Sequence, residues 1–143
     1  MIRDFIASIL QTQTLCRNII QRKMREHKIN VTFEMLHVLK YLDIAGKVNQ
    51  QELAKLAYKD KSSLSYLINT LEKRELVKRE VDPNDKRNKM IVRTEKGDIL
   101  YAEVKSIIED VYQEMTMGQN PEHIQLCIEY MTEFKQNLKN KKL

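Results

Sequence analysis

A group of hydrogen-bonding side chains shares one face of a predicted helix between residues 61 and 71. The leucines and isoleucine of this segment recur at helical spacing and form its buried side. Exposed helix faces usually carry Lys and Glu, because Ser and Asn compete with the helix backbone for hydrogen bonds. A face built from small polar residues therefore indicates contact with a ligand surface. Its members are Lys61, Ser62, Ser63, Ser65, Tyr66 and Asn69.

A basic hairpin is predicted directly after this helix. Residues 77–81 alternate in polarity, residues 90–93 are strand-like, and the turn-rich loop 82–88 joins them. Lys and Arg neutralise backbone phosphates, and narrow minor grooves attract Arg. The loop therefore has the chemistry of a polyanion-binding tip, carried by Asp85, Lys86, Arg87 and Asn88.

Charge and composition support a helical domain with one polyanion-facing side. The 143 residues carry a net charge of +5, with 42% apolar residues and few Gly and Pro. Residues 59–96 hold eleven basic and seven acidic groups, whereas residues 97–134 hold one basic and eight acidic groups. The balance excludes a disordered or low-complexity chain. Ordinary solvated helix surface remains an alternative explanation of the charges.

The elements that position these groups follow from periodicity and capping signals. We expect a long amphipathic helix over residues 2–28, a helix from Phe33 to Gly46 capped by Thr32, and a small strand at 47–49. A capping box at Asn49–Glu52 begins a short helix with Leu53, Leu56 and Ala57 as its buried side. Residues 58–61 form a tight connection, in which Asp60 or Ser62 caps the next helix. The last two helices begin near Thr94 and at Asn120.

Two short helices followed by a basic hairpin define a winged helix-turn-helix, which occupies residues 32–96. The fold class is thus mainly α with a small β-hairpin wing. The second helix enters the major groove of double-stranded DNA, where Ser, Asn and Tyr bond base edges or phosphates. The wing tip reaches the minor groove.

The sequence resembles the MarR (multiple antibiotic resistance regulator) family of bacterial transcription factors. The resemblance is specific over roughly residues 47–100 and rests on helix order elsewhere. The matching stretches are QELAKL at 51–56, DKSSLS at 60–65, LEKRELV at 71–77, DPNDKR at 82–87 and TEKG at 94–97.

This resemblance implies a homodimer and assigns roles by position. The terminal helices, residues 1–28 and 97–143, would interdigitate with those of a second protomer. The whole chain, residues 1–143, would form a single domain. Asp85 would brace the wing, and Arg87 would insert into the minor groove. Glu75 stands where the family usually has Gly, which implies a differently shaped turn. Tyr66 stands where many members are basic, so the operator preference does not carry over.

The terminal helices also favour a dimer on their own evidence. Each has a long apolar stripe at a chain end, and a 143-residue monomer would struggle to cover both. The alternative is that the two stripes pack on each other within one chain. We expect a homodimeric regulator, more often repressor than activator, bound to a pseudo-palindromic duplex with recognition helices about 10 bp apart.

Three residues are candidates for control by a ligand or by oxidation. The resemblance implies a small aromatic effector bound between the dimer helices and the winged domain. His37 and Tyr41, four apart on one helix, offer polar handles there, with Cys16 on the first helix. Cys16 as a redox sensor is an alternative, although a Cys on an apolar stripe usually behaves as a small hydrophobe.

Other classes of function lack their motifs. There is no phosphate-cradling Gly-rich loop, nucleophile elbow or H-E-x-x-H, so we expect no enzyme and no cofactor. The His and Cys residues lack zinc-ligand spacing, so no metal site is expected. Two cysteines, no signal peptide and no membrane-spanning stretch indicate a cytoplasmic protein. A winged-helix module that binds a protein partner is the remaining alternative.

Overall fold

The computed structural model describes residues 1–57 and 59–141 of the chain. Tyr58, from the predicted tight connection, and residues 142–143, from the predicted C-terminal segment, lie outside the described residues. The chain divides into two compact units, Met1–Glu109 and Asp110–Leu143. Within the described part, no helix is both long and apolar enough to cross a membrane.

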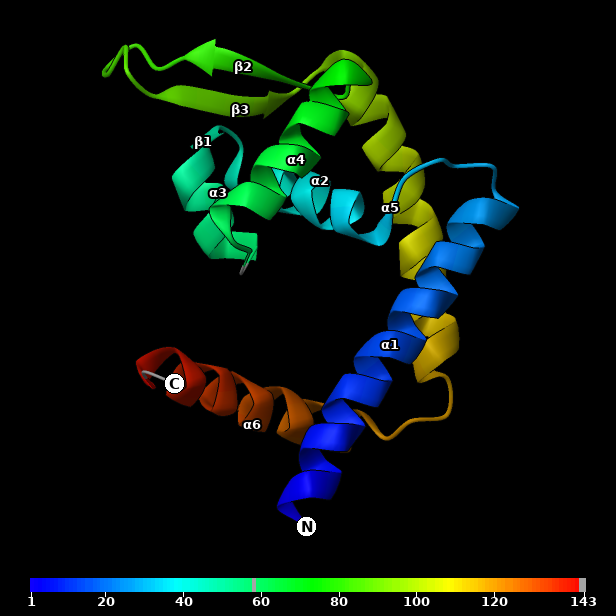
Figure 1. Cartoon of the computed structure of the whole chain (residues 1–143). Helices are drawn as coiled ribbons and strands as arrows, with labels where there is room; N and C mark the ends of the chain where they lie inside the picture. The colour runs from blue at the N-terminus through cyan, green and yellow to red at the C-terminus, as the bar shows by residue number, and fades with distance from the viewer. Residues whose placement is uncertain (58, 142–143) are drawn as a thin grey trace. The chain divides into compact units, whose positions relative to one another are not determined.

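The first unit is a helical body with a small sheet (Figure 1). Its elements in chain order are α1 (Ile2–Glu26), α2 (Phe33–Ala45), β1 (Val48–Asn49), α3 (Gln50–Ala57), α4 (Lys61–Lys73), β2 (Val77–Val81), β3 (Lys89–Arg93) and the first part of α5 (Glu95–Thr116). The strands pair antiparallel in the order β1-β3-β2. The predicted fold class, mainly α with a hairpin wing, is confirmed.

The predicted helix starts are present as side-chain caps. The Met35 amide donates to Thr32 Oγ1 at 3.2 Å, and the Ser63 amide donates to Asp60 Oδ1 at 2.9 Å. Asp60 rather than Ser62 is therefore the N-cap of α4. The capping box before α3 forms as well, because the Glu52 amide donates to Asn49 Oδ1 at 2.8 Å. Each cap satisfies a backbone N–H that has no partner inside its helix.

The core of the first unit lies where α2, α3 and α4 pack beneath the sheet. Its fully buried side chains include Leu39 of α2, Leu53 of α3, Leu64 and Ile68 of α4, and Ile91 of β3. The buried side of α3 is narrower than the sequence pattern predicted, because Leu56 is 40% exposed. The core therefore fixes α4 by its apolar side and leaves its polar face outside.

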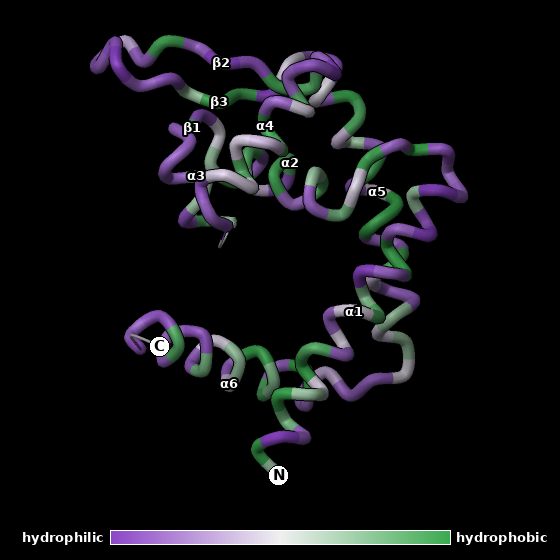
Figure 2. Tube along the Cα trace, viewed as in Figure 1, coloured by the Kyte–Doolittle hydropathy of each residue, from purple (hydrophilic) through white to green (hydrophobic). Residues whose placement is uncertain are grey.

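The second unit contains the end of α5 and all of α6 (Pro121–Asn140). Asn120 caps α6 through a 2.8 Å bond from the Glu122 amide, as predicted. None of the described residues of α6 is buried, although the helix alternates polar and apolar segments along its length (Figure 2). Three of its aliphatic side chains, Leu126, Ile128 and Leu138, are exposed.

Candidate nucleic-acid interface

The N-terminal turn of α4 is organised by its cap. Asp60 accepts hydrogen bonds from both the amide and the hydroxyl of Ser63, at 2.9 and 2.7 Å. These bonds lower the pKa of the Asp60 carboxyl, the backbone bond most strongly. Lys61, Ser62 and Tyr66 remain exposed, and Tyr66 keeps 71% of its surface open. The predicted polar face of α4 is thus accessible apart from the groups that the cap occupies.

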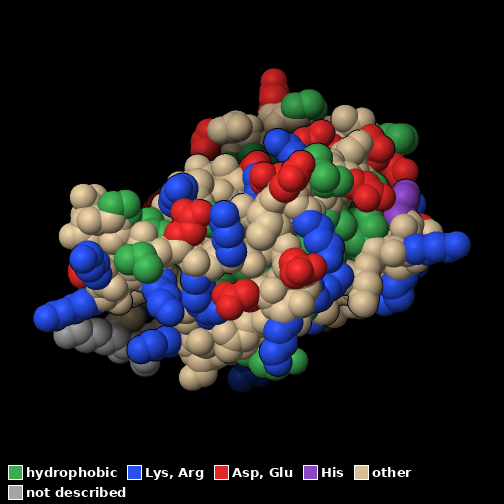
Figure 3. All heavy atoms as spheres, turned by 90° about the horizontal axis from the view of Figure 1, so that it is seen from above, with side chains coloured by type: hydrophobic (Ala, Val, Ile, Leu, Met, Phe, Trp, Pro, Cys, Tyr) green, Lys and Arg blue, Asp and Glu red, His purple; other side chains and the backbone are tan. Residues whose placement is uncertain are grey.

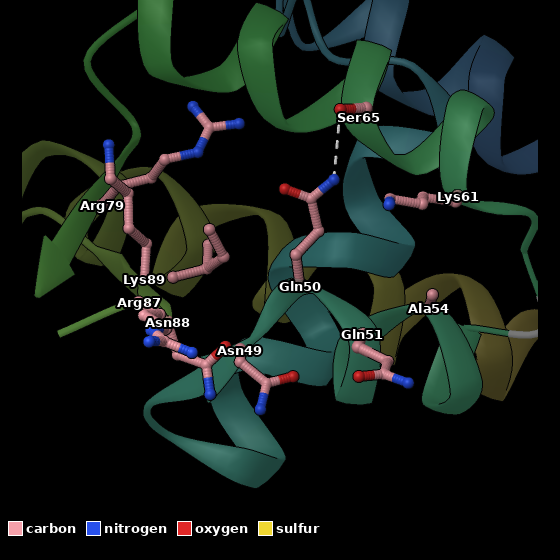
Figure 4. A pocket seen from close by; sticks show the side chains of 11 residues that line it. Asn49, Gln50, Gln51, Ala54, Lys61, Ser65, Arg79, Arg87, Asn88 and Lys89 are labelled. Atoms are coloured by element: carbon pink, nitrogen blue, oxygen red, sulfur yellow. Dashed lines mark hydrogen bonds between the residues drawn. The ribbon is translucent and has the colours of Figure 1, made fainter. Parts of the chain in front are cut away.

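Helix α3 supports the middle of that face. Gln50, in the first turn of α3, donates through Nε2 to Ser65 Oγ at 3.1 Å (Figure 4). Both side chains are half-buried. Because the bond joins the two helices of the helix-turn-helix, it fixes Ser65 against α3.

Strand β2 reaches the same helix through Arg79. One guanidinium nitrogen donates to Asn69 Oδ1 at 2.9 Å, and another donates to Glu72 on the next turn of α4. Only 22% of the Arg79 side chain is exposed. Val77 and Arg79 are two apart on one strand, so both lie on the face of β2 that meets α4. Val77 is buried there, and Arg79 bonds the helix surface.

The wing loop is held by two aspartates. Asp85 accepts from the Arg87 amide at 3.0 Å and from the Asn88 side-chain amide at 3.3 Å. Asp82 accepts from the Asn84 amide at 2.9 Å. The Asp85 carboxylate thus bonds within the loop, while the Arg87 side chain remains exposed.

A hollow of about 780 Å³ opens between α3, α4 and the wing (Figure 4). Basic side chains reach it from three elements, amides line its floor at the start of α3, and no acidic residue is among its lining. An opening with this lining favours an anion, since charge-assisted bonds to phosphate need cations and N–H donors. Its residues are Asn49, Gln50, Gln51, Ala54, Lys61, Ser65, Arg79, Arg87, Asn88, Lys89 and Ile91.

The surface charge follows the same division. Viewed from above, Lys and Arg side chains predominate at the left end of the visible face, and acidic side chains gather at the upper right (Figure 3). Around the hollow, α4 and the wing contribute the basic residues Lys61, Arg79, Arg87 and Lys89.

The far end of the hairpin is anchored through Arg93. Its guanidinium bonds Asp98 of α5 at 2.8 Å and Asp43 of α2 at 2.9 Å, and lies 4.6 Å from the Tyr101 ring centroid. Next to it, Thr94 Oγ1 donates to the Glu75 carbonyl and accepts from the Gly97 amide. Strand β3 is therefore fixed to two helices of the body where it ends.

The residues predicted for an effector pocket are only partly brought together. The His37 ring contacts Tyr41 with centroids 6.4 Å apart and Phe33 at 4.3 Å. Burial lowers the pKa of His37, helped by the positive charges of Lys40 and Lys59, which favours the neutral imidazole. Cys16 is a half-buried free thiol on α1 and, among the described residues, has no hydrogen bond to either ring. Residues 1–57 and 59–141 hold no cluster of His, Cys, Asp or Glu suited to a metal ion.

The contribution of α3 to the interface was not predicted from its sequence pattern. Gln50 and Gln51 line the hollow, whereas the pattern of residues 49–52 predicted only a helix cap. Arg79 is one of the eleven basic residues of segment 59–96, and its bonds to Asn69 and Glu72 were not predicted from the sequence. Glutamines in the first turn of the helix before the recognition helix were the available signal, and that end of α3 lies beside the wing because β1 pairs with β3 at Asn49 and Met90.

The chain matches known proteins over the segment that holds this geometry. Residues 31–89 match the MarR family model. The HTH-type transcriptional regulator SarZ of Staphylococcus haemolyticus is 27% identical over 93 residues, which are 65% of this chain and 63% of SarZ. The match thus spans a little under two thirds of that relative's length.

Solved structures share the fold across most of the chain. A cysteine-to-serine mutant of MarR from E. coli complexed with operator DNA has a TM-score of 0.82 at 20% identity, covering 92% of this chain and 93% of that one. Bordetella bronchiseptica BpsR, whose DNA binding is regulated by 6-hydroxynicotinic acid, has a TM-score of 0.78 at 20% identity, covering 95% and 93%. At these identities the likeness shows the fold. The segment 31–89 therefore resembles the MarR family domain in sequence, and the chain shares its fold with the solved MarR structure.

Proposed function

We propose that this protein is a DNA-binding transcriptional regulator, acting as a repressor, that binds a pseudo-palindromic operator as a homodimer. The observation that carries the proposal is the acid-free hollow between α3, α4 and the wing, with Lys61, Arg79, Arg87 and Lys89 around it. Duplex DNA presents closely spaced phosphates, which such a set of cations and amides neutralises. SarZ is named as a transcriptional regulator, and the E. coli MarR structure holds operator DNA.

In this proposal the two parts of the interface read different grooves. Helix α4 presents Ser62, Ser65, Tyr66 and Asn69 to base edges and phosphates in the major groove. The wing delivers Arg87 to the minor groove, with Asp85 holding the loop from behind. Lys61, Ser63, Lys86 and Asn88 contact the flanking backbone.

Arg87→Ala tests the assignment of the wing. Duplexes are first selected by the wild type from sheared genomic DNA, and affinity is then measured by fluorescence anisotropy. We expect roughly tenfold or greater loss of affinity, because the minor-groove cation disappears. Lys105→Ala removes the same charge from α5, away from the hollow, and is expected to bind as the wild type does. Equal affinities of Arg87→Ala and wild type would overturn the wing assignment.

Salt dependence separates DNA from a protein partner. Counterions leave the duplex when phosphates are neutralised, so log K should fall linearly with log salt, with a slope set by the number of phosphates. We expect a steep fall for wild type and a shallower one for Arg87→Ala. A flat response would instead favour a winged module that binds protein.

The homodimer is supported by exposed apolar side chains on both predicted dimerisation helices. On α1, Ile2, Leu10 and Leu15 are 74%, 57% and 63% exposed. On α6, Leu126 and Tyr130 are 62% and 54% exposed. Exposed apolar side chains of this kind favour an interface, since their contact with water is unfavourable. Two protomers would place their α4 helices about one DNA turn apart.

A small aromatic effector is the proposed release signal. The rings of Phe33, His37 and Tyr41 along α2 offer stacking surface, and neutral His37 can exchange hydrogen bonds with a phenolic hydroxyl. BpsR responds to 6-hydroxynicotinic acid, a ligand of this class. The compounds tested are hydroxylated aromatic acids, and the first is 6-hydroxynicotinic acid. We expect them to raise the melting temperature of the wild type and of Tyr41→Phe more than that of His37→Ala. Equal shifts in all three proteins would place the ligand elsewhere.

A further inference from the structure

The pair Asn69 and Arg79 fixes which hydrogen-bonding group α4 shows to its ligand. An Asn side chain normally offers either its oxygen or its NH₂ group, because the amide can turn over. Here the Asn69 oxygen accepts from Arg79 at 2.9 Å. Guanidinium has donors only, so an amide that faces it must present oxygen. The Asn69 NH₂ group therefore points away from Arg79.

The outward NH₂ group is available. Asn69 is exposed, and within residues 1–57 and 59–141 its nitrogen has no hydrogen-bond partner. It lies three and four residues after Tyr66 and Ser65, which places it on the same face of α4. The group thus belongs to the surface that the proposed function assigns to DNA.

Arg79 is itself held in place. Its second bond goes to Glu72, three residues after Asn69, so the guanidinium is gripped from two turns of α4. The carboxylate also offsets the charge of Arg79, which makes this arginine a weaker phosphate ligand than Arg87. Buried Val77, on the same strand face, sets the approach of β2 to the helix.

We propose that Arg79, anchored by Glu72, is a positioning residue that locks Asn69 as a donor-only reader of one base in each half-site. A fixed NH₂ group accepts guanine, adenine or thymine, whose major-groove edges offer acceptors. It rejects cytosine, whose N4 amino group is a donor. The lock also prevents the two-bond contact with adenine, which needs the amide oxygen. This inference rests on the proposed function and adds a specificity rule to it.

The test measures base preference position by position. Wild type, Asn69→Ala, Asn69→Asp and Arg79→Met are titrated against the selected duplex and its single-base variants by fluorescence anisotropy. In the wild type we expect cytosine to be disfavoured roughly tenfold at one position of each half-site. Asn69→Asp keeps an oxygen on Arg79 and turns the other outward, so its relative preference should shift toward cytosine at that position. Asn69→Ala should lose the discrimination.

The arginine variant separates positioning from simple support. Arg79→Met frees the amide to turn, so discrimination should relax at the Asn69 position and persist elsewhere. A merely structural loss would lower affinity for all duplexes alike. The double variant Asn69→Ala/Arg79→Met should match Asn69→Ala in its base profile. Thermal melts report folding, and if Arg79→Met does not fold, Glu72→Gln loosens the same link from an exposed position and should relax the same base.

Each contrary outcome is distinct. A sequence preference in the wild type that Asn69→Ala leaves unchanged at every position would overturn the inference and leave the proposed function standing. An Asn69-dependent position that neither Arg79→Met nor Glu72→Gln alters would remove the role of Arg79. A wild type without any sequence preference would remove the proposed function, and this inference with it.

Discussion

Two residues other than glycine adopt the left-handed backbone conformation where a helix ends. Glu75 has φ +60° and Lys28 has φ +58°. In both places the amide of the next residue donates a hydrogen bond back to the last turns of the helix. The Leu76 amide donates to the Leu71 carbonyl, and the Ile29 amide donates to the Met24 carbonyl. This is the Schellman turn that usually ends in Gly. The turn before the wing therefore keeps the shape that a Gly would give, at the expense of strain in Glu75.

Removing that strain should stabilise the protein. We expect Glu75→Gly and Lys28→Gly each to raise the free energy of unfolding by about 1 kcal/mol, because a side chain disfavours the left-handed region. The lost Glu75–Lys96 ion pair is 3.6 Å long and exposed, so it offsets little. Lys40→Gly, inside α2, should lower stability by about 1 kcal/mol. Urea unfolding measures all three, and destabilisation by Glu75→Gly would contradict the account.

The cap of α4 predicts a pH dependence. Hydrogen bonds from Ser63 lower the Asp60 pKa below its ordinary 3.8, so the folded carboxyl loses its proton more readily than the unfolded one. Its stabilisation is present above that ordinary value and disappears as pH falls through the lowered pKa. Asp60→Asn keeps a capping oxygen without a titrating group. Thermal melts between pH 3 and 7 should show wild type losing its advantage over Asp60→Asn in acid, and a constant difference would refute this.

At the scale of the elements, Gly97 of α5 packs closely against the backbone of Leu76, in the turn before the wing. A Cβ on Gly97 would lie 2.0 Å from the Leu76 carbonyl oxygen. Gly97→Ala must therefore shift backbone, and we expect a loss of about 3 kcal/mol in the free energy of unfolding. Gly118→Ala is the matched control, since its Cβ meets nothing within 4 Å and only its positive φ costs about 1 kcal/mol. Both losses are measured by denaturant unfolding. Equal losses of stability in Gly97→Ala and Gly118→Ala would contradict the close contact between Gly97 and Leu76.

The elements were largely predictable because their signals are local. The caps Thr32, Asp60 and Asn120 bond backbone only two or three residues away, so short patterns reveal them. The links made by Arg79 and Arg93 were not predictable. Arg93 reaches Asp43 across fifty residues, and which of many charged residues it meets depends on how β3 packs on α2. The hollow likewise needed α3, α4 and the wing to be placed together.

For the whole molecule, the exposed apolar surface predicts association. Light scattering should give twice the 17.0 kDa chain mass. Ile128→Asp adds a charge to an apolar residue of α6 that is 54% exposed, and it should shift the mass toward one chain. Ile44→Asp makes the same change on α2, where the residue is 71% exposed outside the predicted dimerisation helices, and should leave the mass unchanged. A monomeric wild type would overturn the homodimer.

The aspartates of the wing bear on how fast the protein finds its site. Because Asp82 and Asp85 already bond their loop in the free chain, Arg87 need not wait for a disordered segment to fold. The entropy cost of ordering the wing loop is then met when the protein folds, and not at each encounter with DNA. Association should approach the rate set by diffusion and charge attraction. Differences in occupancy between operators would then arise from residence time, and a regulator of this kind searches quickly and discriminates by how slowly it leaves.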